Sequence, residues 1–279
     1  MATTNIVVER VAGAMGAVMT GVDLSGKPSK ATMAAIRDAL VEHQVVFIRD
    51  QNLDALGLVR FARILGEPNI YPFVEGLPDA PEIFEILKAE NDTRNFGGGW
   101  HSDSTYLENP PAFTMLFAKD VPSVGGDTIY ANTYLAYERL SPGLQETLRT
   151  LDGINSAALS GAGGRAKLTS ENTKMKRQNM SDADEIEAIH PIAPLHPDTG
   201  RRALYLSRAH TVRFVGMTAE ESKPMIDYLA DYAVRPDFTC RMKWEVGTLG
   251  IWDNRCTQHY ALNDYPGERR RMWRATVRV

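Results

Sequence analysis

The sequence is poor in cysteine and lacks several features that mark particular classes of protein. Only Cys240 and Cys256 occur among its 279 residues, which is too few for a disulfide framework or a four-cysteine zinc ribbon. No apolar run approaches the roughly 20 residues of a membrane-spanning helix, and the first ten residues lack the basic and apolar regions of a signal peptide. We therefore expect a cytoplasmic protein with reduced thiols and no membrane partner.

The sequence also has no excess of positively charged residues. Lys and Arg number 31 against 35 Asp and Glu, so the formal net charge is −4. Because a non-specific nucleic-acid binder needs a basic surface to displace counterions from phosphates, this balance argues against a nucleic-acid partner. The hydrophobic share of 43% is typical of a globular chain. Since no repeat or linker interrupts it, residues 1–279 are expected to form one domain.

Short apolar segments separated by turn residues dominate the chain from about residue 82. Strands are expected at 83–87, 113–118, 128–131, 154–158, 203–207, 240–244, 249–252 and 272–279, and helices at 134–151 and 219–234. Earlier strands are expected at 6–9, 17–24 and 45–48, with helices at 31–43, capped by Ser29, and at 53–65. This pattern predicts a mainly β fold of the α+β class, a jelly roll with flanking helices. The weakly patterned residues 161–179 are expected to form a lid over the active site.

A histidine and an aspartate stand two positions apart after a run of three glycines. In an extended segment, His101 and Asp103 would point to the same side and could bind one metal ion. His259, which follows a predicted strand and a polar turn, has the most suggestive setting for a third ligand. Two histidines and a carboxylate form the facial triad of non-haem Fe(II), which leaves coordination positions open. By itself, however, a His-x-Asp pair is a weak signal, and on its own it favours two polar residues at a strand end over a metal site.

A basic cluster follows in this otherwise acidic chain. Residues 269–274 read Arg-Arg-Arg-Met-Trp-Arg, and on a strand Arg270 and Arg274 would share one face. Because a guanidinium matches a carboxylate bidentately, this pair is expected to bind anions. Arg269 and Arg271 would lie on the other face and are interpreted as solvated.

Four separated motifs then carry a family resemblance. They are Trp-His-Ser-Asp-Ser-Thr-Tyr-Leu-Glu-Asn-Pro-Pro at 100–111, Pro-Ser-Val-Gly-Gly-Asp-Thr at 122–128, Trp-Asp-Asn-Arg-Cys-Thr-Gln-His-Tyr-Ala at 252–261 and Asp-Tyr-Pro-Gly-Glu-Arg-Arg-Arg-Met-Trp-Arg-Ala-Thr at 264–276. In this order, the set resembles the taurine and 2,4-dichlorophenoxyacetate dioxygenase (TauD/TfdA) family of Fe(II)/2-oxoglutarate-dependent oxygenases. The resemblance covers nearly the whole chain.

The resemblance implies a role for each matched residue. Fe(II) would be bound by the catalytic set His101, Asp103 and His259, the distal carboxylate of 2-oxoglutarate by Thr128 and Arg270, and the substrate anion by Arg274, with Tyr71 as a further candidate in the substrate pocket. The family fold is the double-stranded β-helix. The implied reaction hydroxylates a small anionic organic substrate with O2, while 2-oxoglutarate yields succinate and CO2. A homo-oligomer, either a dimer or a tetramer, is also implied.

Two departures from the family pattern narrow the range of expected substrates. Taurine-specific members have a histidine just before a Tyr-Pro pair and an asparagine shortly before His-x-Asp, whereas residues 67–70 here read Glu-Pro-Asn-Ile and residues 97–99 are all glycine. Taurine is therefore disfavoured, and an aryloxyalkanoate or another carboxylate or sulfonate is expected. Two alternatives stay open: a zinc-dependent hydrolase on the same His/Asp/His set and a non-catalytic jelly-roll binding protein. The hydrolase gives Arg270 no role, and the binding protein leaves the ordered motifs unexplained.

Overall fold

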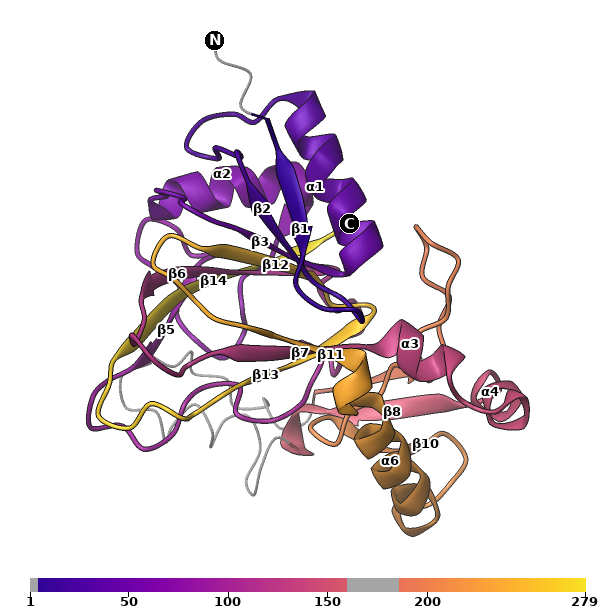
Figure 1. The fold of residues 1–279 in the computed structure, drawn as a ribbon. Coiled ribbons are helices and arrows are strands. Elements are labelled where there is room, and N and C mark those ends of the chain that lie inside the picture. Colours follow the sequence, from indigo (N-terminus) through magenta and orange to yellow (C-terminus); the bar gives the residue numbers. More distant parts are fainter. Residues whose placement is uncertain (1–4, 160–185) are drawn as a thin grey trace.

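The computed structural model describes residues 5–159 and 186–279. The lid predicted at 161–179 lies outside these described residues. Within them, β-strands outnumber helices and form three sheets (Figure 1). None of the helices in this part of the chain is long and apolar enough to cross a membrane.

The largest sheet has eight strands. Its order is β1-β2-β3-β12-β6-β14-β4, and β5 also pairs with β14. All its pairs are antiparallel except β2 with β3. The strands are β1 (Val7–Arg10), β2 (Ala17–Thr20), β3 (Val45–Ile48), β4 (Glu67–Pro68), β5 (Phe84–Lys88), β6 (Phe113–Asp120), β12 (Leu249–Asp253) and β14 (Arg270–Arg278).

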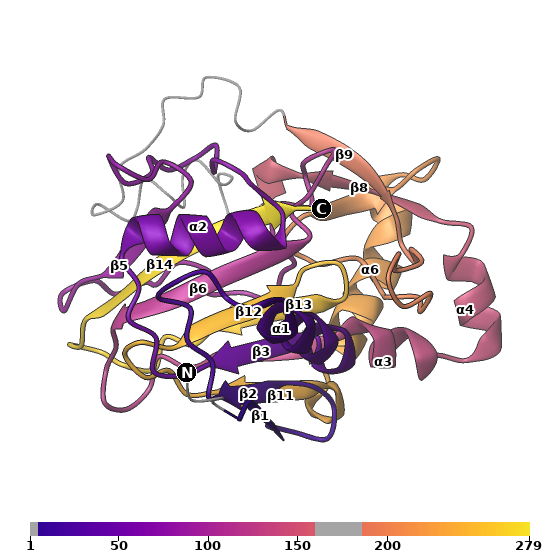
Figure 2. The ribbon, with the colours of Figure 1, turned by 90° about the horizontal axis from the view of Figure 1, so that it is seen from above.

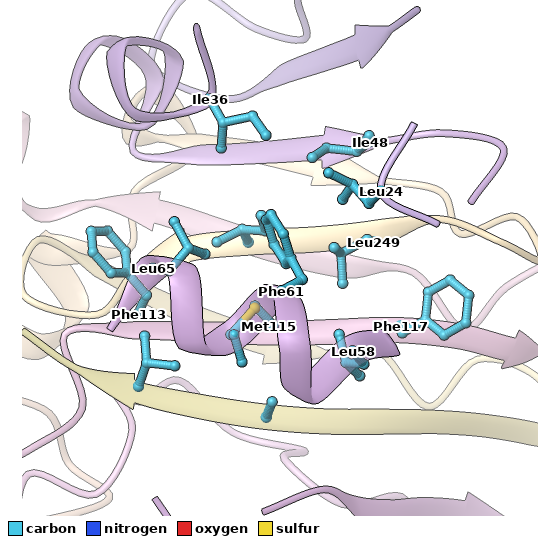
Figure 3. Packing of buried hydrophobic residues seen from close by; sticks show 14 of the residues in the cluster. Leu24, Ile36, Ile48, Leu58, Phe61, Leu65, Phe113, Met115, Phe117 and Leu249 are labelled. Carbon is cyan, nitrogen blue, oxygen red and sulfur yellow. The ribbon is translucent and has the colours of Figure 1, made fainter. Parts of the chain in front are cut away.

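Two helices cover one face of this sheet. The N-cap of α1 (Lys30–His43) is Ser29, as predicted, and α2 (Ala55–Leu65) begins after Asp54, whose side chain accepts from a backbone N–H in the first turn. Seen from above, α2 lies over β14 and α1 lies over β3 and β12 (Figure 2). Their apolar faces, represented by Ile36 and Phe61, pack on alternate strand residues such as Met115 (Figure 3). Helix packing therefore occupies only one side of the large sheet.

The other face of the large sheet meets a three-stranded sheet of order β11-β7-β13. Its strands are β11 (Thr239–Met242), β7 (Thr128–Asn132) and β13 (Thr257–Ala261), and they lie below β12, β6 and β14 in Figure 1. Phe47 and Trp252 from the large sheet pack with Tyr130 of β7 in a shared core. This arrangement brings β13 and β14 to the two sides of one interior.

A third sheet, of order β10-β8-β9, carries the remaining helices. Its strands are β8 (Asp152–Ser156), β9 (Glu187–Pro191) and β10 (Thr211–Phe214). The helices beside it are α3 (Thr133–Glu138), α4 (Pro142–Leu148) and α6 (Ala219–Ala233), with short 3-10 turns η1 (Ala157–Leu159) and η3 (Pro236–Phe238). Leu148, Phe214 and Leu229 share its apolar core.

Three sequence expectations about these elements are wrong. The helix predicted at 134–151 is two helices, because Ser141 precedes Pro142 and adopts an extended conformation that ends one helix and begins the next. Residues 203–207 form no strand, since their N–H groups bond to scattered carbonyls such as those of Thr133 and Ile192. The strand predicted at 17–24 ends at Thr20, before Gly21 turns with φ +73°.

Candidate active site

His101, Asp103 and His259 come together from two distant segments. His259 lies on β13, and its N–H donates to the carbonyl of His101 at 2.9 Å, while the N–H of His101 donates to the carbonyl of His259 at 3.2 Å. This bridge fixes the two histidines side by side, with ring centroids 4.2 Å apart. The Oδ1 atom of Asp103 lies 3.5 Å from Nε2 of His101 and 3.9 Å from Nε2 of His259. The predicted polar turn before His259 is therefore short, and strand structure resumes at Thr257.

These three side chains fit a single metal ion. Two ligand atoms that each lie about 2.1 Å from one ion are about 3.0 Å apart when adjacent and about 4.2 Å apart when opposite, and the distances from Asp103 Oδ1 to both Nε2 atoms fall between these values. The carbonyl of Gly99 lies 2.7 Å from Nδ1 of His101, which assigns the proton to Nδ1 and leaves the Nε2 lone pair for a metal. Two imidazoles and one carboxylate form a donor set that suits non-haem Fe(II).

Buried partners hold the aspartate in this orientation. Thr114 on β6 donates its hydroxyl to Oδ2 of Asp103 at 2.7 Å, so the other oxygen, Oδ1, faces the histidines. The side chain of Asn254 accepts from the N–H of Asp103 at 2.6 Å and donates to its carbonyl at 2.9 Å. Sequence reasoning did not identify Thr114 or Asn254. The only signal for Thr114 was a hydroxyl within the apolar run of a predicted strand.

Arginine charge stabilises the carboxylate. Burial opposes ionisation of Asp103, but nearby Arg274, followed by His259 and His101, outweighs burial and holds the carboxyl pKa well below its usual range. Nη2 of Arg274 lies 2.6 Å from Oδ1 of Asp103. The Arg274 guanidinium also stands 5.6 Å from the ring centroid of Tyr71. Tyr71 thus lies beside the arginine that the resemblance assigns to the substrate.

Arg270 and Arg274 share one face of β14, as the alternation predicted. The outward neighbour Arg271 pairs with Glu85 instead. Arg270 is 4% exposed, and its Nε and Nη2 atoms have no hydrogen-bond partner among the described residues. Burial lowers the pKa of this guanidinium. A buried guanidinium with unused donors is a costly feature unless a ligand supplies the acceptors.

These residues surround one pocket of about 390 Å³, a volume that includes its open mouth. Its polar lining is His101, His259, Thr128, Arg270 and Arg274, and its apolar lining is Ile86, Phe96, Gly97, Leu116, Trp252 and Ala261. Tyr71 is not part of this lining. The pocket therefore combines the two histidines of the His/Asp/His group with two arginines and a threonine on otherwise apolar walls, an arrangement suited to an anionic ligand beside a metal.

A second buried group, formed by His196, Asp253 and Cys256, also has donor atoms close enough for one ion. Its polar atoms already have partners within the chain. Nε2 of His196 lies 2.9 Å from Asp253, and Nδ1 of His196 accepts from the N–H of Asp198 at 3.3 Å. The Arg255 guanidinium donates to both carboxylate oxygens of Asp253. Burial also keeps the pKa of the Cys256 thiol well above its usual value. This group is a closed structural network.

The fold and the pocket define a mainly β protein whose candidate metal site adjoins an anion pocket. Residues 8–276 match the model of the taurine catabolism dioxygenase TauD, TfdA family. The chain is 35% identical to an alpha-ketoglutarate-dependent sulfate ester dioxygenase of Pseudomonas putida over 97% of this chain and 88% of that protein. It is 33% identical to an alkylsulfatase of Acinetobacter baylyi, over 99% and 86%.

A solved structure agrees with these relatives. The crystal structure of a taurine dioxygenase from Burkholderia xenovorans superposes with a TM-score of 0.81 at 33% identity, covering 98% of this chain and 89% of that one. The chain belongs to the TauD/TfdA family and is an alpha-ketoglutarate (2-oxoglutarate)-dependent dioxygenase. The reaction class inferred from its motifs is thereby confirmed. The hydrolase and the non-catalytic binding protein are set aside.

Proposed function

We propose that this dioxygenase binds Fe(II) through His101, Asp103 and His259 and hydroxylates a small organic substrate that carries an anionic group. The observation that carries the proposal is the approach of two imidazole Nε2 atoms to one carboxylate oxygen within 3.5 and 3.9 Å. The same pocket contains the unused donors of buried Arg270. A metal site beside an anion site is what a 2-oxoglutarate-dependent reaction requires.

The remaining pocket residues bind 2-oxoglutarate and the substrate. When bound, Fe(II) supplies the redox chemistry by which O2 and 2-oxoglutarate oxidise the substrate. Arg270 and Thr128 hold the distal carboxylate of 2-oxoglutarate, because both line the pocket and the arginine has donors to spare. Arg274 binds the anionic group of the substrate. The apolar walls, including Phe96, exclude water from the reacting atoms.

Among anionic substrates, we propose an alkyl sulfate ester as the first class to test. The support is the similarity to the sulfate ester dioxygenase, together with Arg274 at the pocket wall. Aryloxyalkanoates and sulfonates follow in the panel. Taurine is placed last, because residues 97–99 are glycines where taurine-specific members have an asparagine and no histidine precedes Tyr71. The small side chains leave room for a larger organic group.

We also infer that the eight-stranded sheet and the β11-β7-β13 sheet together form the double-stranded β-helix, a jelly-roll variant. Their facing sides share one apolar core, and that core surrounds the candidate metal site. The family match over residues 8–276 supports treating 1–279 as a single dioxygenase domain. A dimer or tetramer is the proposed assembly.

The decisive experiment is an anaerobic absorbance titration of the metal-free protein with Fe(II) and then 2-oxoglutarate. We expect a weak visible charge-transfer band that saturates near one equivalent of 2-oxoglutarate. Candidate substrates are then screened by their effect on the band and by succinate formed in air. Absence of the band, with Zn(II) bound in preference or no metal bound, would overturn the proposed site.

A further inference from the structure

Trp244 follows β11 and contacts Thr128, one of the residues that line the pocket. Its indole Nε1 donates to Oγ1 of Thr128 at 2.9 Å, and the two residues are 116 positions apart in the sequence. Trp244 is 3% exposed and Thr128 is 2% exposed. The hydrogen bond is therefore shielded from water, so water does not compete for the Thr128 hydroxyl at this position.

The direction follows from donor chemistry. An indole N–H can only donate, so Oγ1 of Thr128 must act as an acceptor in this contact. The hydroxyl hydrogen of Thr128 is then directed to another acceptor. Thr128 lines the pocket together with Arg270, whose Nε and Nη2 donors are unused among the described residues. Both side chains thus have a donor group at the pocket, and a carboxylate, which only accepts, can bind both.

The Trp244 ring has little freedom to turn away. It packs edge-on against Phe47, with ring centroids 5.8 Å apart and planes at 82°. On β12, a Cβ at Gly250 would lie only 2.7 Å from Cη2 of Trp244, so the absence of a side chain there makes room for the indole. The Arg270 guanidinium lies 5.9 Å from the ring. The indole is held between the large sheet and the anion pocket.

We propose that Trp244 is a positioning residue for the co-substrate, which sets the Thr128 hydroxyl as a donor to the distal carboxylate of 2-oxoglutarate. This inference rests on the proposed function, because it takes Thr128 and Arg270 as the carboxylate clamp. It adds to that clamp a residue that occupies one of the two acceptor positions on Thr128 Oγ1.

The test is a double-mutant cycle on Trp244→Phe and Thr128→Val. Affinity for 2-oxoglutarate is measured by calorimetry on protein loaded with Mn(II), so that no turnover occurs, and Mn(II) affinity is measured separately. We expect Trp244→Phe to weaken 2-oxoglutarate about fivefold and Thr128→Val about tenfold. The double variant should match Thr128→Val within about twofold, because Trp244 acts only through that hydroxyl. Mn(II) affinity should not change.

Three controls separate positioning from general damage. Trp273→Phe removes another indole N–H, which lies 3.3 Å from Glu85, and should leave 2-oxoglutarate affinity unchanged. Thr128→Ser keeps the hydroxyl, so Trp244→Phe should still cost about fivefold in that background. Binding of 2-oxopentanoate, which lacks the distal carboxylate, should be the same in wild type and Trp244→Phe.

The possible results separate failure of the proposed function from failure of the role proposed for Trp244. If the Mn(II)-loaded wild type binds no 2-oxoglutarate, the proposed function falls and the role of Trp244 falls with it. If the wild type binds but the two effects multiply in the double variant, Trp244 does not act through Thr128 and only the inference is overturned. Equal weakening of 2-oxopentanoate, or a parallel loss of Mn(II) affinity, would likewise overturn it.

Discussion

Two buried groups in this chain each contain a histidine and an aspartate, and they differ in how closely the histidine approaches the carboxylate. In the group around Asp253, His196 and Arg255 supply hydrogen bonds of 2.6 to 2.9 Å. In the group around Asp103, both histidine Nε2 atoms lie 3.5 Å or more from the carboxylate, which is long for a hydrogen bond.

This difference separates a metal-ligand set from a structural network. Both groups contain metal-binding residue types within 4.8 Å of one another, so residue type and proximity do not distinguish them. The hydrogen bonds of the histidines do. Both carboxylates have close partners, since Asp103 accepts from Thr114 and pairs with Arg274. Both ring nitrogens of His196 are also used within the chain, whereas the Nε2 atom of His101 keeps its lone pair for a metal because Nδ1 already donates to Gly99.

The largest expected effect comes from removing a histidine from the first group. His101→Ala should abolish Fe(II) binding and 2-oxoglutarate turnover while the protein stays folded, because one of three ligands is lost. The matched variant in the second group, His196→Ala, should still bind one metal ion per chain. Metal content after dialysis and circular dichroism measure both. Metal binding that survives His101→Ala would remove that residue from the site.

Arg270→Ala should weaken binding of the co-substrate without weakening binding of the metal. We expect 2-oxoglutarate affinity to fall about 100-fold, since a buried, charge-assisted pair is lost, while Fe(II) affinity stays the same. The anaerobic charge-transfer titration reports both constants. Arg271→Ala, on the opposite face of β14, is the control and should behave like wild type. Loss of iron with normal 2-oxoglutarate affinity would contradict the clamp.

Asp253→Asn tests the closed network through stability. We expect a loss of about 2 kcal/mol at pH 7, because a neutral amide cannot pair with Arg255. Burial opposes ionisation of Asp253, yet His196 and Arg255 lower its pKa below the usual value. Its stabilising contribution is therefore present above the unfolded pKa and disappears as the pH falls through the folded pKa. Denaturant unfolding at several pH values should show the variant and wild type converging in acid.

Arg274→Ala should act on the primary substrate. At saturating metal we expect the KM for that substrate to rise about 20-fold, because the anion loses a charged donor, with 2-oxoglutarate affinity of the metal-loaded protein nearly unchanged. Metal affinity is measured separately, because Arg274 also pairs with Asp103. Succinate formation at varied substrate concentration measures the effect. The assignment would fail if KM were unaffected once a true substrate is known.

The smallest effect is expected at Thr114, which orients Asp103 without facing the ion. Thr114→Val keeps the shape and removes the hydrogen bond to Oδ2, and metal affinity should weaken about tenfold. Thr276→Val, on a facing strand position of β14, offers a matched loss of a buried hydroxyl and should leave metal affinity unchanged. Equal effects of the two variants would argue for loss of packing.

Much of the candidate site followed from local sequence. The two-residue period of a strand predicts that Arg270 and Arg274 share one face, and β14 places both at the pocket. His101, Asp103 and His259 followed from donor chemistry and family motifs. The prediction of one long helix at 134–151 was wrong because the apolar pattern continues across Pro142, where the second helix begins.

The amino-acid sequence alone specifies the types of donor, their order along the chain and the alternation that turns them inward, because these depend on side-chain chemistry and backbone geometry over a few residues. Which of these donors are used within the protein depends on the tertiary structure. Residues far apart in the chain close the Asp253 network and set the Thr128 hydroxyl through Trp244. A hydrogen bond between distant residues depends on how the sheets stack, and no local pattern encodes that distance.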